Sequence, residues 1–483
     1  MPRVTLAQGR IGPVGLWVMA VVASSPLTVQ VGGIPTMYAT TAVAGVPLAF
    51  LMVAAVLYVI AVGYVGAAGH LGHAAPLYAV MGRGLSPVVG IAAGVCALVG
   101  YLAIGTSLYG LLGTTLVGLT GSGPWWLWSV WALTVVAVLG LVGGLRNVWI
   151  VGFLLAVELA VIVFYVAAAL SQRPGRLVFD GFSPSELLVP GLAGVVAFAM
   201  AAFVGVETVP AYAEEARGGA ASVRRAMLAA IGFAGAFYAL GAWAMAVHAG
   251  PGGLAQIGTD AAGGPLQVLS SVFGPSMGAL TTMLLMTSVV AAMSAFHQVG
   301  TRYLFAMARE QVLPGFLATT NRSGETPVAA SLTQTVLAGL VIAGFALSGA
   351  DPLGGMFAWL STLGAVVLLG LLVVVCAAVL RFFATGQGGD DSVLVRRAAP
   401  VTGLVLGSLL MAMMLANLGA LLGLAPGSRR WLLLPALAGA VLVAGLGWGV
   451  VLRLARPAVL AGVGRVVADP VSSPARRLGK LVM

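Results

Sequence analysis

The chain has 483 residues, of which 60% are hydrophobic and only 7% are charged. Soluble domains carry about 25% charged residues, so this composition excludes an ordinary soluble protein and indicates an integral membrane protein. The net charge of +10 would also suit a nucleic-acid-binding protein, but the arginines are dispersed between apolar segments and form no basic module. We therefore expect the lipid bilayer as a partner and no nucleic acid. Cys96 and Cys376 lie within apolar segments, so no disulfide is expected.

Apolar segments long enough to cross a membrane recur along the whole chain. A spanning helix needs about 20 apolar residues, and the sequence predicts twelve such helices and no soluble domain. The first follows Arg3 and Arg10 and resembles a signal peptide, but it lacks a small-residue cleavage site and is expected to be retained. The predicted spans are residues 13–36, 42–68, 88–119, 125–145, 148–170, 190–212, 225–248, 273–305, 327–348, 355–380, 400–424 and 431–454.

Basic residues divide unequally between the two sides of this topology. With the N-terminus inside, 19 of the 23 basic residues face the cytoplasm, which predicts a multi-pass protein of the cell membrane with both termini cytoplasmic. The basic tail from Arg453 to Met483 is expected at the cytoplasmic membrane surface. The outer side keeps Arg173, Arg176, Arg429 and Arg430, and the inner side holds Arg3, Arg10, Arg83, Arg146, Arg217, Arg224, Arg225, Arg302, Arg309, Arg322, Arg381, Arg396, Arg397, Arg453, Arg456, Arg465, Arg476, Arg477 and Lys480.

Two apolar spans contain matching interruptions. The first span carries Pro26 among serine and threonine residues, and the sixth carries Gly205, Glu207 and Pro210 in close succession. Broken helices near the midplane are typical of secondary transporters. Because five spans separate the interruptions, the second copy would be inverted. We therefore predict a transport core over residues 1–380, made of helices 1–5 and 6–10, with helices 11 and 12 and the tail appended over 381–483. Taken singly, Gly and Pro also occur for packing.

Three segments resemble the amino acid–polyamine–organocation (APC) superfamily. Phe203-Val204-Gly205-Val206-Glu207, followed by Glu214-Glu215-Ala216-Arg217, is similar to its sixth helix. The segment from Arg302 to Pro314 is similar to the end of its eighth helix, and Glu325-Thr326-Pro327 to the entry of its ninth. The resemblance covers roughly residues 11 to 380. It implies an all-α membrane protein with a LeuT-like 5+5 inverted repeat and the activity of an amino acid permease.

The first interruption is a candidate site for a carboxylate. Unwinding between Ser24 and Thr28 would free backbone N–H groups near Leu27 and expose the positive end of a half-helix, which suits an anion. The hydroxyls of Ser24, Ser25 and Thr28 would add hydrogen bonds. In the alternative, these hydroxyls bond back to their own helix and only bend it.

The second interruption is a candidate site for an ammonium group. Carbonyls released around Phe203, Val204 and Gly205, next to Val206, would accept from a substrate ammonium. The two breaks together match a zwitterion. The resemblance to APC transporters implies the same, because there the two unwound segments bind the α-carboxyl and α-amino groups.

Two polar residues of other helices are candidates for lining the same pocket. Tyr101 in the third helix and Ser294 in the eighth would face the substrate, with simple helix packing as the alternative. Some family members gate the site with an aromatic residue at the position that Ala201 occupies here, so Phe198 or Phe203 would serve instead.

Three ionisable residues within the spans are candidates for coupling. Glu207 lies at the break of the sixth helix, Glu158 in the middle of the fifth and His297 in the eighth. Such residues are costly in a membrane and are often functional, although each could instead join helices as a satisfied polar group. Related antiporters place a proton-sensing carboxylate at the position of Glu207, and some relatives have a charged residue on helix five near a lost sodium site. A proton is the expected coupling ion, with Na⁺ as the weaker alternative at Glu158.

The favoured interpretation is a permease that moves amino acids by alternating access, with proton coupling or exchange. No cofactor and no metal site is expected, because His70 and His73 read as interfacial residues without an acidic or cysteine neighbour. A polyamine or organic-cation carrier would need more acidic groups in the pocket. A membrane-embedded enzyme would need a cluster such as H-E-x-x-H, which is absent. A channel would not need paired broken helices.

Overall fold

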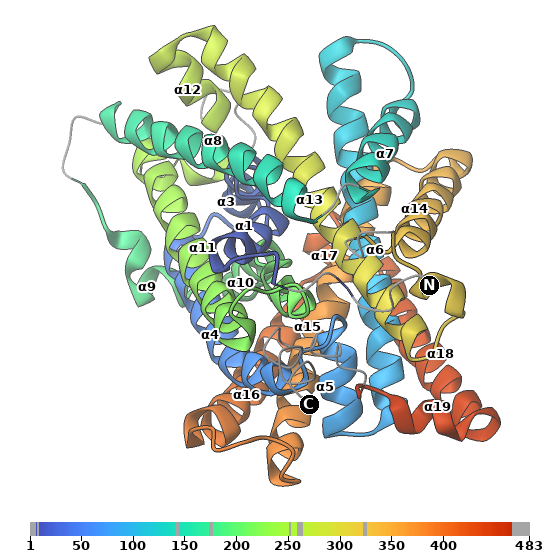
Figure 1. Cartoon of the computed structure of the whole chain (residues 1–483). Helices are drawn as coiled ribbons and strands as arrows, with labels where there is room; N and C mark the ends of the chain where they lie inside the picture. The colour runs from blue at the N-terminus through green and yellow to red at the C-terminus, as the bar shows by residue number, and fades with distance from the viewer. Residues whose placement is uncertain are drawn as a thin grey trace, which may run out of the picture.

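The computed structural model describes residues 6, 9–141, 144–172, 177–250, 253–257, 264–321 and 326–465, without the side chains of residues 144–147 and 255. Within these ranges the chain is helical throughout, and the only extended pairing is an isolated parallel bridge between Ile11 and Ala216. The expected all-α membrane architecture is therefore confirmed (Figure 1).

Eleven helical segments of the described chain are long and apolar enough to span a membrane. The fourth predicted span is the exception, because its helix α7 (Trp125–Leu141) is shorter than the others and residues 142–143 lie outside the described ranges. The eleven are Pro13–Thr41 (α1, α2, η1 and α3), Val46–Leu71 (α4), Pro87–Thr120 (α6), Val148–Ser171 (within α8, Gly144–Ser171), Leu192–Tyr212 (α10 and η3), Gly219–Ala249 (α11), Pro275–Arg309 (α13), Val328–Ser348 (α14), Pro352–Ala384 (η6 and α15), Leu394–Ala416 (η7 and α16) and Arg430–Ala455 (η8 and α18).

Proline and glycine set many of the helix ends. α6 begins at Pro87, whose missing N–H is tolerated in a first turn, and Ser86 caps it by accepting from the Val89 N–H at 3.3 Å. α4 ends at Gly72 and α6 at Gly121, both in the left-handed conformation that glycine adopts without strain. α13 runs to Arg309, one turn beyond the predicted end at residue 305, and so carries Arg309 within the folded bundle.

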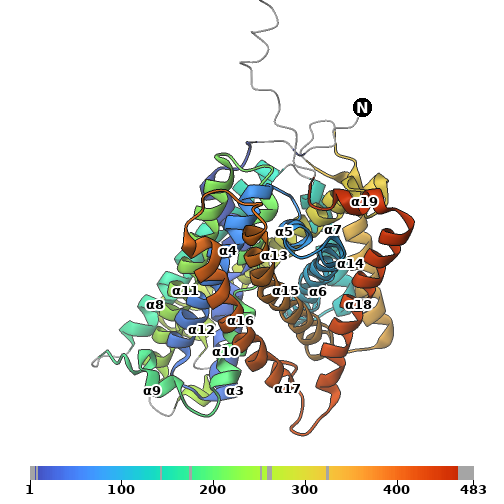
Figure 2. The ribbon, with the colours of Figure 1, turned by 90° about the horizontal axis from the view of Figure 1, so that it is seen from below.

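Several short helices connect the spans, and the sequence analysis did not anticipate them. The most important for the site is α5 (Pro76–Gly84), which lies between α4 and α6 and packs on both. α19 (Pro457–Gly462) follows the last span and contacts α6 and α18 (Figure 2). The remaining short elements are η2 (Asp180–Phe182), α9 (Pro184–Leu187), η4 (Leu254–Gln256), α12 (Pro265–Phe273), η5 (Gly315–Ala318) and α17 (Leu418–Leu421).

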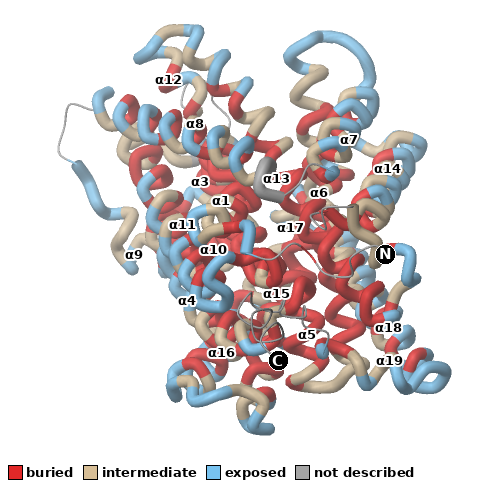
Figure 3. Tube along the Cα trace, in the orientation of Figure 1, coloured by how far each residue is buried: buried red, intermediate tan, exposed pale blue. Residues whose placement is uncertain are grey.

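The two interrupted spans lie in the centre of the bundle. α1 (Pro13–Ala23) packs against η3 (Val206–Tyr212), α8, α11 and α13, so the first and sixth spans are in direct contact. Figure 3 shows buried chain around α1, α10 (Leu192–Ala202) and α13, and exposed positions along α14 and α12 at the edge. Exposed leucines on α14 and α18 suit helices whose outer faces contact lipid.

Candidate substrate and coupling site

The first break lies between α1 and α2 (Pro26–Thr28). α1 ends at Ala23, and Ser25 has φ 48°, a left-handed conformation that is uncommon for a residue with a side chain. Pro26 begins the next helical stretch and has no N–H. In the described chain the N–H groups of Leu27 and Thr28 donate no turn or cap hydrogen bond, so they form the unsatisfied positive end of the continuing helix.

The serine hydroxyls of this break are partly engaged by the protein itself. Ser24 Oγ donates to the Val21 carbonyl at 2.8 Å, which is the back-bonding that the alternative interpretation describes. Ser25 Oγ lies 2.7 Å from Thr28 Oγ1. Ser24 thus shapes the end of α1, whereas Ser25 and Thr28 form a hydroxyl pair beside the free N–H groups.

The second break separates α10 from η3. Gly205 has φ 114°, which favours glycine, and the chain then continues as a 3₁₀-helix. The Phe203 carbonyl accepts from the Val206 N–H at 3.2 Å, and the Gly205 carbonyl accepts from both the N–H and the hydroxyl of Thr208. Of the three carbonyls predicted as acceptors, only that of Val204 takes no part in these turn hydrogen bonds.

The two breaks touch each other at Gly205. A Cβ built on Gly205 would lie 2.7 Å from the Ala23 Cβ and 2.8 Å from its carbonyl carbon. Real Cβ atoms do not approach backbone this closely, so only glycine fits here. The end of α1 and the turn at Gly205 are therefore in direct contact.

Tyr238 of α11 contacts residues of both breaks and is not among the residues predicted from the sequence. Its hydroxyl donates to Ser24 Oγ at 2.8 Å, and its ring lies 5.7 Å from that of Phe203 and 5.4 Å from that of Phe50. Phe203 is itself fully buried, whereas Phe198 is half-buried. Nothing in the sequence near Tyr238 distinguishes it from a packing residue, because its partners are distant in the chain.

A polar chain connects the first break to Glu158. Ser288 of α13 donates to Glu158 Oε2 at 2.7 Å, and Ser288 Oγ lies 3.1 Å from Ser25 Oγ. Glu158, Ser288 and Ser25 are all buried. The structure thus brings two predicted residues, Glu158 and Ser25, together through one that was not predicted.

Glu207 is buried beside the second break. Its Oε2 accepts from the Gly205 N–H at 2.7 Å, and its Oε1 has no hydrogen-bond partner among the described residues by the usual distance and angle limits. Tyr64, Tyr101 and Tyr303 are its electrostatic neighbours. A buried carboxylate without a cation is costly in its charged form, which favours binding of a proton.

His297 and Ser294 lie on α13, and in the described part of the chain neither is hydrogen-bonded to Glu207. His297 Nε2 is 2.9 Å from Ser331 Oγ of α14, and the buried Ser294 hydroxyl has no partner in the described ranges. A cavity of about 10 Å³, the space of a single water, lies between α6, α13 and α14. Its polar lining consists of Tyr101, Thr106, Tyr109, His297 and Gln334.

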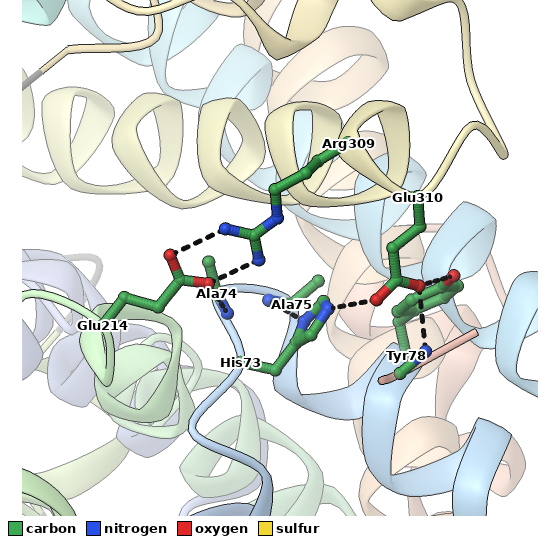
Figure 4. A network of polar contacts seen from close by, with 8 residues as sticks. His73, Ala74, Ala75, Tyr78, Glu214, Arg309 and Glu310 are labelled. Atoms are coloured by element: carbon green, nitrogen blue, oxygen red, sulfur yellow. Dashed lines mark hydrogen bonds and ion pairs between the residues drawn. The ribbon is translucent and has the colours of Figure 1, made fainter. Parts of the chain in front are cut away.

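Buried ion pairs tie the end of the sixth span to α13. Arg309 binds Glu214 through two bonds of 2.6 and 3.0 Å, and Arg302 binds Glu215 through two of 2.7 and 3.0 Å (Figure 4 for Arg309). Arg302 also stacks over Tyr212 at 4.1 Å. Such bidentate pairs fix geometry strongly. We call this end of the bundle the ion-pair end.

Glu310 anchors a second network at the ion-pair end. Its carboxylate lies 2.9 Å from His73 Nε2 and accepts from the Tyr78 hydroxyl and from the Gly464 N–H at 2.9 Å (Figure 4). Burial alone would raise the pKa of Glu310, but His73, Tyr78 and Gly464 outweigh it and hold the pKa below its usual value. Burial and the nearby Glu310 raise the pKa of Tyr78, which therefore stays protonated and donates. The expectation that both histidines are interfacial and lack an acidic neighbour is wrong. His73 is buried against Glu310, and the partly exposed His70 lies 2.6 Å from Asp391 Oδ2.

The N-terminal segment closes the same end. The N–H groups of Arg10 and Ile11 both donate to the Glu215 carbonyl at 3.0 Å, and the Arg217 N–H donates to the Ile11 carbonyl at 2.7 Å. The acidic pair of the sixth span thus binds α13 through its side chains and the chain's start through its backbone.

Comparison with known families decides the identity. A family model described as amino acid permease matches residues 15–434, which includes both breaks and the acidic pair. The chain belongs to the amino acid permease family. It is therefore a membrane transporter of the APC superfamily, as the three resembling segments implied.

Solved structures share the fold of this permease. The manganese transporter of Eremococcus coleocola, in complex with an aromatic bis-isothiourea substituted compound, superposes with a TM-score of 0.54 at 15% identity over 90% of the permease and 94% of that chain. A histidine-to-alanine variant (TM-score 0.52) and a glutamate-to-glutamine variant (0.53) of the same transporter match with the same identity and coverage. At this identity the likeness concerns the fold alone. A comparison with curated proteins gives no match.

Proposed function

We propose that this permease transports amino acids by alternating access and binds the zwitterion between its two broken helices. The observation that carries the proposal is the contact of the breaks at Gly205 and Ala23. This contact supports the proposal because the free N–H group of Leu27 follows Ala23 by four residues, and the carbonyl of Val204 directly precedes Gly205. N–H groups at a helix start attract the carboxylate, and an unwound carbonyl accepts from the ammonium.

In this proposal the ion-pair end is the cytoplasmic side and both termini are cytoplasmic. The unequal division of the basic residues supports this orientation. The pairing of Arg302 with Glu215 and of Arg309 with Glu214 supports a proposed state that is closed toward the cytoplasm. Inward opening then requires that these pairs separate.

Glu207 is the proposed proton-binding group. Its burial and its contact with the Gly205 N–H link protonation to the conformation of the second break. When the pocket is closed, the neutral acid is favoured, and water entering the open pocket favours the carboxylate. A proton can shift the balance between states only through such a difference in affinity. Glu158 is the second candidate, because Ser288 connects it to the first break.

An organic cation with several charges is a weaker substrate for this site. Glu158 and Glu207 have different hydrogen-bond partners, Ser288 for the first and Gly205 for the second. No group of three potential metal ligands occurs in the described ranges, so no observation favours a metal ion as the substrate.

Uptake into proteoliposomes tests the proposal. The purified permease is reconstituted and offered labelled amino acids, diamines and Mn²⁺ at several pH values, with and without the unlabelled compound inside. We expect saturable uptake of at least one amino acid, faster at an inwardly directed proton gradient or with internal substrate. Uptake of diamines or Mn²⁺ without any amino acid would overturn the substrate class.

A further inference from the structure

The chain after the last span docks at the ion-pair end. Val463 is 2% exposed, and a Cβ on Gly82 of α5 would lie 2.7 Å from its Cγ1. Gly464 has φ 68°, and a Cβ there would meet the Ala79 Cα and carbonyl oxygen at 3.1 Å. This segment therefore packs its backbone directly on α5, in a conformation that glycine makes easy.

Glu310 joins this segment to two others. His73 comes from the connection after α4, Tyr78 from α5 and Gly464 from the segment beyond α19. All three meet one buried carboxylate at the end of α13. A carboxylate that accepts several hydrogen bonds in a buried place is held firmly, and removing one donor leaves part of it unsatisfied.

The same carboxylate is next to the ion pair of the sixth span. Arg309, which precedes Glu310 in the chain, binds Glu214, and Glu214 Oε1 also accepts from the Ala74 N–H at 3.2 Å. Residues 73 and 74 therefore contact Glu310 and Glu214 at once (Figure 4). A displacement at Glu310 would reach Arg309 and Glu214 through adjacent backbone.

We propose that residues 463–465 form a C-terminal strap that stabilises the state closed toward the cytoplasm by completing the shell of Glu310. This inference rests on the proposed function in one respect only, namely that the ion-pair end is the cytoplasmic gate. Release of the strap would weaken the hold on residues 73–78 and on the Arg309–Glu214 pair, and so favour inward opening. The strap would then set how readily the permease opens, without contacting the substrate.

Two truncations that differ by three residues test the strap. A chain ending at Arg465 keeps it, whereas a chain ending at Gly462 lacks it. Hydrogen–deuterium exchange in detergent reports on residues 73–78 and 206–217 without any need for a transported substrate. A hydrogen bond to a charged group accounts for about a tenfold change in an opening equilibrium. We expect exchange about tenfold faster in these segments only for the chain ending at Gly462.

Two full-length variants test the strap independently, so that misfolding of the shortened chain cannot decide the result. Val463→Asp places a charge in the buried docking position, and Ala458→Asp places the same charge at an exposed position of α19. Faster exchange at residues 73–78 and 206–217 is expected only for Val463→Asp. Unchanged exchange in both the Gly462 truncation and Val463→Asp would overturn the strap, whereas failed amino acid uptake with the expected exchange would overturn only the proposed function.

Discussion

The ion-pair end and the breaks differ in whether their buried ionisable side chains have an oppositely charged partner. At the ion-pair end, Arg302 and Arg309 each have a bidentate carboxylate partner. At the breaks, Glu158 and Glu207 are equally buried, but none of the ion pairs in the described part of the chain includes them. The pairs suit a gate that is closed or open, whereas the unpaired carboxyls suit groups that gain and lose a proton.

The physical reason is the free energy that is needed to change each arrangement. Removing one partner of a buried pair leaves an uncompensated charge and costs about 3–5 kcal/mol. An unpaired buried carboxyl avoids that cost by taking a proton, which neutralises it. In the proposed function the ion pairs therefore form a rigid latch at one end of the permease, and the unpaired carboxyls form a titratable centre.

The largest effect is expected at the contact of the breaks. Gly205→Val should abolish uptake, because its Cβ would overlap the Ala23 backbone and its φ of 114° disfavours a branched residue. Uptake is measured in proteoliposomes alongside Gly344→Val, whose Cβ would meet open space on α14. Normal uptake by Gly205→Val would show that the substrate binds elsewhere. The breaks would then no longer be the centre that contrasts with the ion-pair end.

The latch should be the next most sensitive element. Arg302→Ala leaves Glu215 buried without a partner, so the apparent free energy of unfolding should fall by about 3–5 kcal/mol in a denaturant titration in detergent. The double variant with Glu215→Ala should recover part of this loss. Arg397→Ala, at an exposed position, is the matched control. If Arg302→Ala were as stable as Arg397→Ala, the ion-pair end would not be a rigid latch.

Removing the ionisable group of Glu207 should change the pH dependence of transport more than the free energy of unfolding. Glu207→Gln keeps the shape but cannot titrate, so the pH profile of flux should flatten while the amino acid still binds. A one-unit pKa difference between states corresponds to about 1.4 kcal/mol, or a tenfold shift. The profile is measured together with that of Glu158→Gln. A flat profile in Glu158→Gln alone would move coupling to α8, and two unchanged profiles would favour plain exchange.

Glu310 should give the smallest and most pH-specific effect. Its folded pKa is lowered, so its stabilising contribution is fully present above the unfolded glutamate pKa of about 4.3 and is lost as the pH falls through the folded pKa. The gap in thermal midpoint between the parent and Glu310→Gln should therefore persist from pH 7 to about 5 and narrow toward pH 3. A gap that widened in acid would contradict the lowered pKa.

The sequence predicts this architecture well wherever local composition decides it. Apolar length placed the spans, and Gly205 and Pro26 marked where two of them are interrupted, because glycine and proline act on their own backbone. It did not find Tyr238 or Ser288, whose partners Ser24 and Glu158 lie far away in the chain. Side-chain pairs of this kind are fixed by packing between helices, which no local pattern records.

The basic residues show the same limit. Arg302 and Arg309 counted equally with surface arginines toward the orientation, because the positive-inside rule considers only the side of the membrane. In the structure both are buried inside the bundle, whereas Arg397 is exposed. Which arginines form the latch depends on the pairing of α13 with the end of the sixth span.

The bridge between Ile11 and Ala216 has a consequence for how the permease is made. Ile11, just before the helix α1, has an extended partner that lies 205 residues later in the chain. At a synthesis rate of about 5–20 residues per second, that partner emerges roughly 10–40 seconds afterwards. During this interval the N–H groups of Arg10 and Ile11 lack the Glu215 carbonyl that they bind in the folded protein, so α1 cannot yet be fastened to the end of the sixth span.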